Sequence, residues 1–99
     1  MILEVIAYDR SQDEYLVGAV WGPGSDWFKN VRAGGAAEVL VGGRRFAPVA
    51  RVLPEPEASV VIEGYRSRRP RWSAMSERMV GRPLSASTVP IVGFRPADT

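Results

Sequence analysis

Apolar and β-branched residues recur in short runs separated by polar or glycine-rich segments, a pattern typical of strands joined in hairpins. Ile2–Tyr8 and Glu14–Val20 are two such runs, joined by the polar stretch Asp9–Asp13, and we predict that they pair. Ala37–Val41 and Arg45–Leu53 predict a second hairpin in the same way. The alternation therefore indicates that antiparallel pairing organises much of the chain.

Two features of the second hairpin constrain its geometry. Gly42 and Gly43 stand between its strands and can both adopt the positive φ angles of a type I′ turn. Pro48 has no amide hydrogen to donate to a neighbouring strand. We therefore expect its strand to lie at a sheet edge or to be bulged at Pro48.

Helix signals occur between the hairpins and before a last strand, Thr88–Arg95. Ser25-Asp26 can cap a short helix from Trp27 to about Ala33, which Gly34-Gly35 ends. A longer helix is predicted from Pro54 to about Arg68, with prolines and acids early and arginines late. Its apolar stripe comprises Ala58, Val61, Ile62 and Tyr65. A third helix, roughly Trp72–Val80, carries Met75 and Met79 on one side.

The predicted order is β-β-α-β-β-α-α-β in one domain covering residues 1–99. Hairpins with helices at the corners favour an α+β fold whose antiparallel sheet curls toward a small barrel. At 45% hydrophobic and 24% charged residues, the composition is that of an ordinary globular domain.

Missing residue types restrict the chemistry. The chain has neither histidine nor cysteine, which excludes zinc sites rich in these residues, Ser-His-Asp triads and Cys-His pairs. No apolar run approaches the roughly 20 residues of a membrane helix, and the N-terminus lacks the basic region of a secretory signal. We therefore expect a cytoplasmic protein without a membrane partner and without a metal site.

Several motifs in order along the chain resemble the deazaflavin-dependent nitroreductase-like family. They are a glycine-rich loop before a helix with Trp27, Asn30 and Val31, a hairpin Glu38–Phe46, an acidic-Ala helix start at Glu55–Ala58, and the strand Val89–Pro96. The resemblance spans about Ile2 to Pro96. It implies an antiparallel split β-barrel of the flavin-reductase-like kind, with short flanking helices.

The resemblance also implies an activity and a cofactor. It predicts hydride transfer from a reduced 5-deazaflavin coenzyme, or less favourably FMN, to a nitro or quinone acceptor. Full-length relatives carry a further N-terminal strand and a basic cofactor motif that this sequence lacks, so the short form is expected either to be inactive and without cofactor or to complete its barrel with a second copy. An exposed sheet edge would then form a homodimer.

Candidate site residues follow from the glycine-rich loop, where glycines permit close approach to a ring or phosphate. The resemblance implies cofactor contacts from Trp21, Gly22, Gly24, Ser25, Trp27 and Asn30. A capping role for Ser25 and a core role for Trp27 are the alternatives. Tyr65 is the candidate catalytic proton donor, and a core position on its helix stripe is its alternative.

The basic run from Arg66 to Arg71 supports several interpretations. It can grip the acidic tail or phosphate of a cofactor, or it is simply a solvated charged segment. Nucleic-acid binding is a less favoured third hypothesis, because no RNP, KH or helix-turn-helix signature accompanies the run. The main alternative to an oxidoreductase is a non-catalytic binding or scaffold protein that keeps the barrel and has lost the cofactor.

Overall fold

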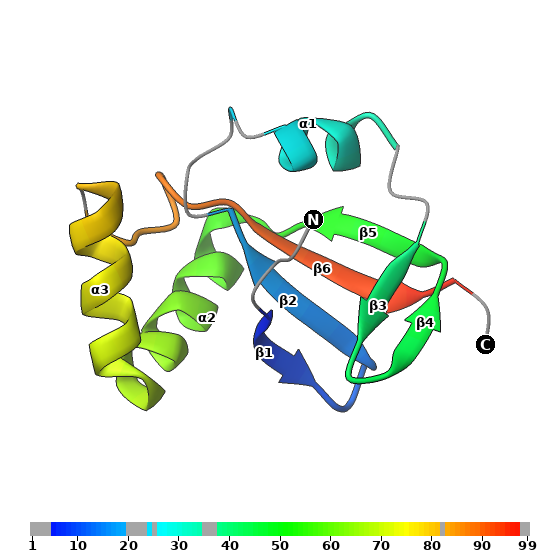
Figure 1. The fold of residues 1–99 in the computed structure, drawn as a ribbon, viewed down its shortest axis with the longest axis horizontal. Helices are drawn as coiled ribbons and strands as arrows, with labels where there is room; N and C mark the ends of the chain where they lie inside the picture. The colour runs from blue at the N-terminus through cyan, green and yellow to red at the C-terminus, as the bar shows by residue number, and fades with distance from the viewer. Residues whose placement is uncertain (1–4, 20–23, 25, 35–37, 82, 98–99) are drawn as a thin grey trace.

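The computed structural model describes residues 5–19, 24, 26–34, 38–81 and 83–97, and the α+β class predicted from the sequence is confirmed (Figure 1). The elements are β1 (Val5–Asp9), β2 (Glu14–Gly18), α1 (Asp26–Arg32), β3 (Val39–Val41), β4 (Arg44–Phe46), β5 (Pro48–Val52), α2 (Glu55–Arg68), α3 (Pro70–Val80) and β6 (Ile91–Pro96).

Four strands form one antiparallel sheet in the order β1-β2-β6-β5, and β3 and β4 form a separate two-stranded ribbon. The C-terminal strand β6 is thus central, with β2 on one side and β5 on the other (Figure 1). The described strands form no closed barrel. The predicted antiparallel pairing is therefore present, and the finer expectation of a split barrel stays a proposal.

The prediction of one continuous strand over Arg45–Leu53 is wrong, because the structure divides this segment at Ala47 into β4 and β5. β4 pairs with β3, whereas β5 leaves the hairpin and pairs with β6, where Pro48 lies opposite Pro96. The cause is local: a proline cannot extend the β3–β4 hydrogen-bond ladder. The expectation that Pro48 lies on an edge strand is confirmed.

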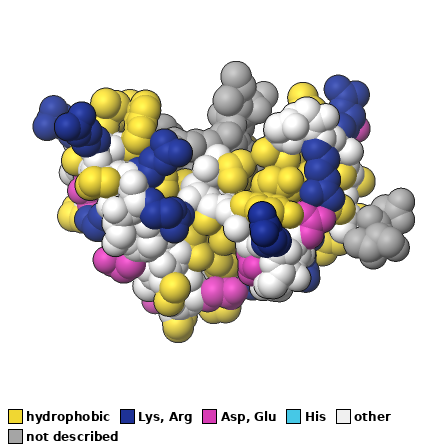
Figure 2. Space-filling model, turned by 90° about the horizontal axis from the view of Figure 1, so that it is seen from below, with side chains coloured by type: hydrophobic (Ala, Val, Ile, Leu, Met, Phe, Trp, Pro, Cys, Tyr) yellow, Lys and Arg dark blue, Asp and Glu magenta, His cyan; other side chains and the backbone are white. Residues whose placement is uncertain are grey.

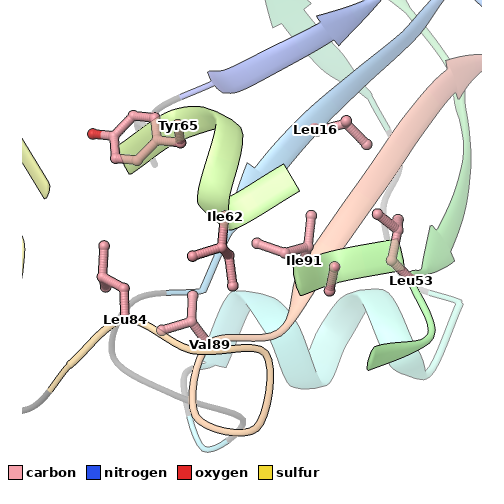
Figure 3. Packing of buried hydrophobic residues seen from close by; sticks show 8 residues of the cluster. Leu16, Leu53, Ile62, Tyr65, Leu84, Val89 and Ile91 are labelled. Carbon is pink, nitrogen blue, oxygen red and sulfur yellow. The ribbon is translucent and has the colours of Figure 1, made fainter. Parts of the chain in front are cut away.

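Each face of the main sheet carries its own apolar cluster, because neighbouring residues of a strand point to opposite sides. Leu16 and Ile91 point toward α2 and pack with Ile62 and Tyr65 (Figure 3). Their chain neighbours Val17 and Val92 point the other way and pack with α1 and the β3–β4 ribbon. The sheet therefore separates α2 from α1.

The β3–β4 ribbon is held to the sheet by charge and aromatic contacts. Gly42 and Gly43 have φ angles of 54° and 78°, as the predicted turn requires. Beside them Arg44 donates two hydrogen bonds to Asp13, at 2.7 and 2.8 Å. The rings of Tyr15 and Phe46 stack with their centroids 5.8 Å apart. These hydrogen bonds from Arg44, together with one that Tyr8 donates to the same carboxylate, lower the pKa of Asp13 to about 2.

The helices follow their predicted boundaries closely. The α2 stripe is confirmed, since Ala58, Ile62 and Tyr65 are buried. On α1, Phe28 is the buried residue and Trp27 is only half-buried against the cluster, a shift of one position from the expected core side chain. α3 begins at Pro70, two residues before the predicted start, because proline is well suited to the first helical position.

A candidate binding groove between β1 and α2

A groove with a volume of about 660 Å³ runs between strand β1 and the C-terminal turn of α2. Its volume falls within the range of about 300–1,000 Å³ typical of small-molecule sites. The lining residues are Val5, Ile6, Ala7, Tyr8, Tyr65, Arg68 and Arg69. The groove therefore combines the edge of a strand, which carries Val5, Ile6 and Ala7, with a tyrosine and two cations.

Strand β1 supplies one wall because, among the described strands, it is an edge strand that pairs with β2 alone. Its register shifts between Val5 and Ala7, which leaves Ile6 in an irregularity of the ladder. Arg68 from α2 donates a hydrogen bond of 2.9 Å to the Ile6 carbonyl oxygen. This contact fixes the width of the groove and joins its two walls.

Tyr65 anchors the other wall. Its residue is 6% exposed, and its ring belongs to the same apolar cluster as Ile62 and Leu84. Figure 3 shows the Tyr65 hydroxyl oxygen pointing away from the labelled aliphatic side chains. Tyr65 thus combines the predicted core position with a place in the groove wall, which are compatible roles for an amphipathic ring.

Arg69 provides the groove with a cation that has no ion-pair partner among the residues the structure describes. It joins α2 to α3 in a non-helical conformation, φ −134° and ψ 63°, and its amide donates to the Tyr65 carbonyl oxygen at 2.8 Å. The backbone at Arg69 is therefore fixed, whereas its exposed side chain can meet a ligand.

The predicted cofactor residues that the structure describes, Gly24, Trp27 and Asn30, do not line this groove. Gly24 and Asn30 are exposed, and Trp27 makes an edge-to-face contact with Phe28 at a centroid distance of 6.1 Å. The remaining three, Trp21, Gly22 and Ser25, lie outside the described residues.

The structure does not bring Tyr65 together with Trp27. Tyr65 packs with Leu16 on one face of the sheet, and Trp27 packs with the cluster containing Val17 on the other. A molecule lying against Trp27 is therefore across the sheet from the Tyr65 hydroxyl of the same chain. Among the described residues of one chain, Tyr65 and Trp27 therefore do not share a site.

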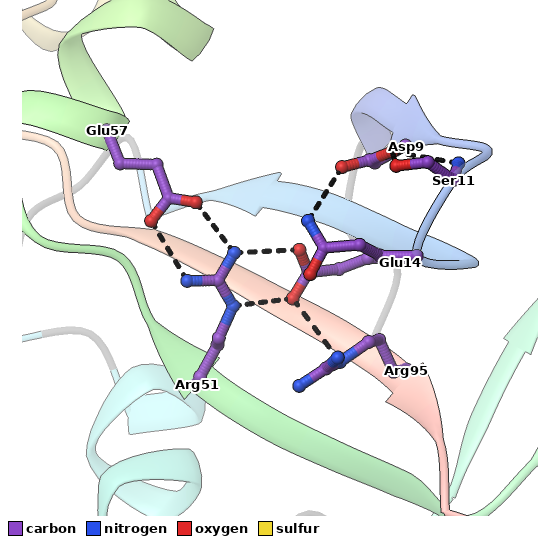
Figure 4. A network of polar contacts seen from close by, with 7 residues as sticks. Asp9, Ser11, Glu14, Arg51, Glu57 and Arg95 are labelled. Atoms are coloured by element: carbon purple, nitrogen blue, oxygen red, sulfur yellow. Dashed lines mark hydrogen bonds and ion pairs between the residues drawn. The ribbon is translucent and has the colours of Figure 1, made fainter.

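A buried ion network, missed in the sequence, lies on the α2 face of the sheet (Figure 4). Glu14 is only 1% exposed, and both of its carboxylate oxygens accept hydrogen bonds from Arg51, at 2.8 and 2.9 Å. Arg51 also donates to both oxygens of Glu57, at 2.8 and 2.9 Å. The two carboxylates keep the pKa of Arg51 above its usual range, and Arg51 lowers the pKa of Glu57. In the sequence, the signal for this network is the presence of the charged residues Glu14 and Arg51 within predicted strands.

Part of the predicted basic run has a structural role. Arg66 contacts the Glu77 carboxylate at 3.0 Å and donates to the Leu84 carbonyl oxygen at 2.6 Å. Glu77 in turn accepts a hydrogen bond from the Leu84 amide, and this bond, followed by Arg66, lowers the pKa of Glu77. Arg66 is therefore committed to the α2–α3 junction, while Arg68 and Arg69 line the groove.

The chemistry open to the groove is binding by charge and apolar contact. Among the described residues, no group of three or more Asp or Glu side chains is arranged to hold a metal ion. No helix in this part of the chain is long and apolar enough to cross a membrane. Comparison with protein-family models, curated proteins and solved structures finds no match.

Proposed function

We propose that the β1–α2 groove binds a small anionic molecule with a planar, apolar body. The observation that carries this proposal is the placement of Arg69, which has no ion-pair partner among the described residues, beside Tyr65 and the edge of β1. Arginine suits phosphate and carboxylate because its planar guanidinium offers paired donors. The apolar side chains of Val5 and Ile6 would cover the ring system and keep water from it.

The cofactor class that we propose is a reduced 5-deazaflavin coenzyme, with FMN as the less favoured ligand. Both join a planar ring to an anionic tail, and the described residues of the groove fit these two parts. Arg69, aided by Arg68, would hold the phosphate or acidic tail, and the ring would lie against β1. When bound, the cofactor supplies the hydride for reduction of a nitro or quinone acceptor.

Tyr65 is the proposed proton donor in that reaction. With the cofactor bound, the Tyr65 hydroxyl would give a proton to the acceptor as it is reduced, and solvent would then restore the proton to Tyr65. Because Tyr65 and Trp27 lie on opposite faces of the sheet, this proposal uses the β1–α2 groove rather than the loop before α1. The α1 site remains the competing proposal, with Asn30 as its accessible test residue.

A second candidate is a non-catalytic binding or scaffold domain. The separation of Tyr65 from Trp27 favours it, because the described residues of one chain do not place the predicted proton donor beside that predicted cofactor residue. In either case we propose that a second copy completes the split barrel through the β5 edge. Val49 and Val52 on β5 are 48% and 45% exposed, which leaves apolar surface for pairing.

The decisive experiment is a fluorescence titration of the purified chain with reduced and oxidised deazaflavin coenzyme and with FMN. We expect Arg69→Ala to weaken binding by about tenfold, while Arg10→Ala, an exposed cation in the β1–β2 turn, leaves it unchanged. Tyr65→Phe should retain binding but lower the rate of acceptor reduction by about 100-fold or more.

Other results of the titration would lead to different conclusions. Binding that is lost in Asn30→Ala and retained in Arg69→Ala would assign the cofactor to α1 and overturn the groove proposal. No binding of either cofactor by a folded chain would leave the non-catalytic domain. Sedimentation velocity tests the dimer, and a monomer at all concentrations would contradict it.

A further inference from the structure

Helix α3 turns its apolar side chains outward, the reverse of an ordinary surface helix. Trp72, Met75 and Met79 are 50%, 55% and 62% exposed. The side facing the domain is polar instead, since Ser73 is buried and Glu77 contacts Arg66 of α2. At the α3 end of the molecule, Figure 2 shows hydrophobic side chains lying among Lys and Arg side chains.

The outward residues follow the spacing of a coiled-coil seam. Trp72, Met75 and Met79 are three and four residues apart, which corresponds to the a, d and next a positions of a heptad repeat. In this register Arg71 and Arg78 both occupy g positions, beside the seam, and both are exposed. These g positions choose a partner by charge, because they lie next to the facing helix.

We propose that α3 is a docking helix for an amphipathic helix of another protein that carries acidic residues beside its apolar seam. Charge complementarity selects this occupant, because Arg71 and Arg78 supply cations and the acid on α3, Glu77, is turned toward Arg66. The exposed methionines suit such a surface, since their unbranched side chains adapt to different partners.

A second copy of α3 is a poorer partner. In an antiparallel pair the g positions face one another, which brings Arg71 and Arg78 of one copy close to the same residues of the other. In a parallel pair each g position meets an e position, and the e residue here is Ser76, which offers no charge. Self-association therefore gains no ion pair from either arrangement.

The test uses the whole chain and a labelled, designed helical peptide of about four heptads with leucine at a and d and glutamate at e and g. Binding is followed by fluorescence anisotropy. We expect saturable binding at least about tenfold tighter than to the same peptide with lysine at e and g, and a decrease in affinity as salt rises. Met75→Asp should abolish binding, because it places a charge in the seam.

Charge reversal provides the matched control. The double variant R71E/R78E should no longer bind the glutamate peptide and should bind the lysine peptide instead. The control variant R10E/R45E makes the same change in net charge away from α3, and it should bind the glutamate peptide as the parent does. Circular dichroism checks that each variant is folded. Equal binding of both peptides, or no effect of R71E/R78E, overturns the proposal. So does failure to bind either peptide together with saturable binding to phosphatidylserine vesicles, which would assign α3 to a lipid surface.

Discussion

The Glu14 carboxylate occupies the space over Gly93 that a side chain at position 93 would need. A Cβ built on Gly93 overlaps the Glu14 side chain, which is itself fixed by Arg51 on the next strand. Glu14 lies on β2, Gly93 on the central strand β6 and Arg51 on β5. The absence of a side chain on the central strand therefore makes room for an ion pair that crosses it.

We predict that Gly93→Ala destabilises the domain by about 1–3 kcal/mol, because the added methyl group forces Glu14 out of its place against Arg51. Urea unfolding followed by circular dichroism measures the change. Gly24→Ala is the control, since a Cβ at Gly24 meets nothing within 4 Å, and it should change stability by less than about 0.5 kcal/mol. Equal effects of the two variants would contradict this account.

Removal of Arg51, the ion-pair partner of Glu14, should destabilise the domain more than Gly93→Ala does. Arg51→Met leaves a carboxylate that is 1% exposed with only Arg95, at 3.9 Å, as an ion-pair partner. We expect a loss of about 3 kcal/mol, the usual cost of an uncompensated buried charge. The double variant Glu14→Leu, Arg51→Met should recover part of it, as thermal and urea unfolding will show. Glu57→Gln removes a carboxylate that is 43% exposed, and it should cost much less than Arg51→Met because solvent screens an exposed ion pair.

Four carboxylates, Asp9, Asp13, Glu57 and Glu77, make the folded state sensitive to acid. Their pKa values are lowered in the folded state, so their contribution is complete above the unfolded pKa and is lost as pH falls through the folded value. Asp13 falls from an ordinary pKa of 3.8 to about 2, and Glu57 and Glu77 fall below 4.5. The midpoint temperature of thermal unfolding should therefore fall as the pH is lowered from about 4.5 toward 2.

The contribution of Asp13 can be separated from that of the other three carboxylates. Asp13→Asn should flatten the decrease between about pH 4 and pH 2, because the carboxylate that titrates against Arg44 is gone. Glu63→Gln is the control, since the Glu63 side chain is 72% exposed and lies 3.8 Å from Arg66. A pH profile of Asp13→Asn identical to that of the parent would show that the Arg44 contact does not contribute.

The α2 core offers a direct test of packing. Ile62 is 4% exposed and contacts the sheet, whereas Val60 on the same helix is 73% exposed. Ile62→Ala should lower the free energy of unfolding by about 2–5 kcal/mol through lost burial and a residual cavity. Val60→Ala should change it by less than about 0.5 kcal/mol. Chemical denaturation of both variants distinguishes them.

Local rules predicted most of the elements but not how they assemble. The Gly42-Gly43 turn and the stripe of α2 depend on neighbouring residues, so both could be inferred from spacing. The sequence predicts only a bulge or a sheet edge at Pro48 and not the break between β4 and β5, because the choice of β6 as partner depends on residues forty or more positions away along the chain.

The candidate site was harder to predict for the same reason. The groove joins Val5–Tyr8 to Tyr65 and Arg69, and no local pattern links residues so far apart in sequence. Separation of Tyr65 from Trp27 depends on which face of the sheet each helix covers. The outward seam of α3 was visible as Met75 and Met79 on one side, but its exposure depends on Glu77 facing α2.

The central place of β6 also governs when the chain can fold during its synthesis. β2 and β5 both pair with this last strand, so β2 lacks its second neighbour and β5 lacks its partner in the sheet until Ile91–Pro96 has left the ribosome. Contacts between segments so far apart along the chain close late and slow folding. Nascent chains that end before Ile91 would therefore display unsatisfied strand edges, which is when chaperone protection matters most.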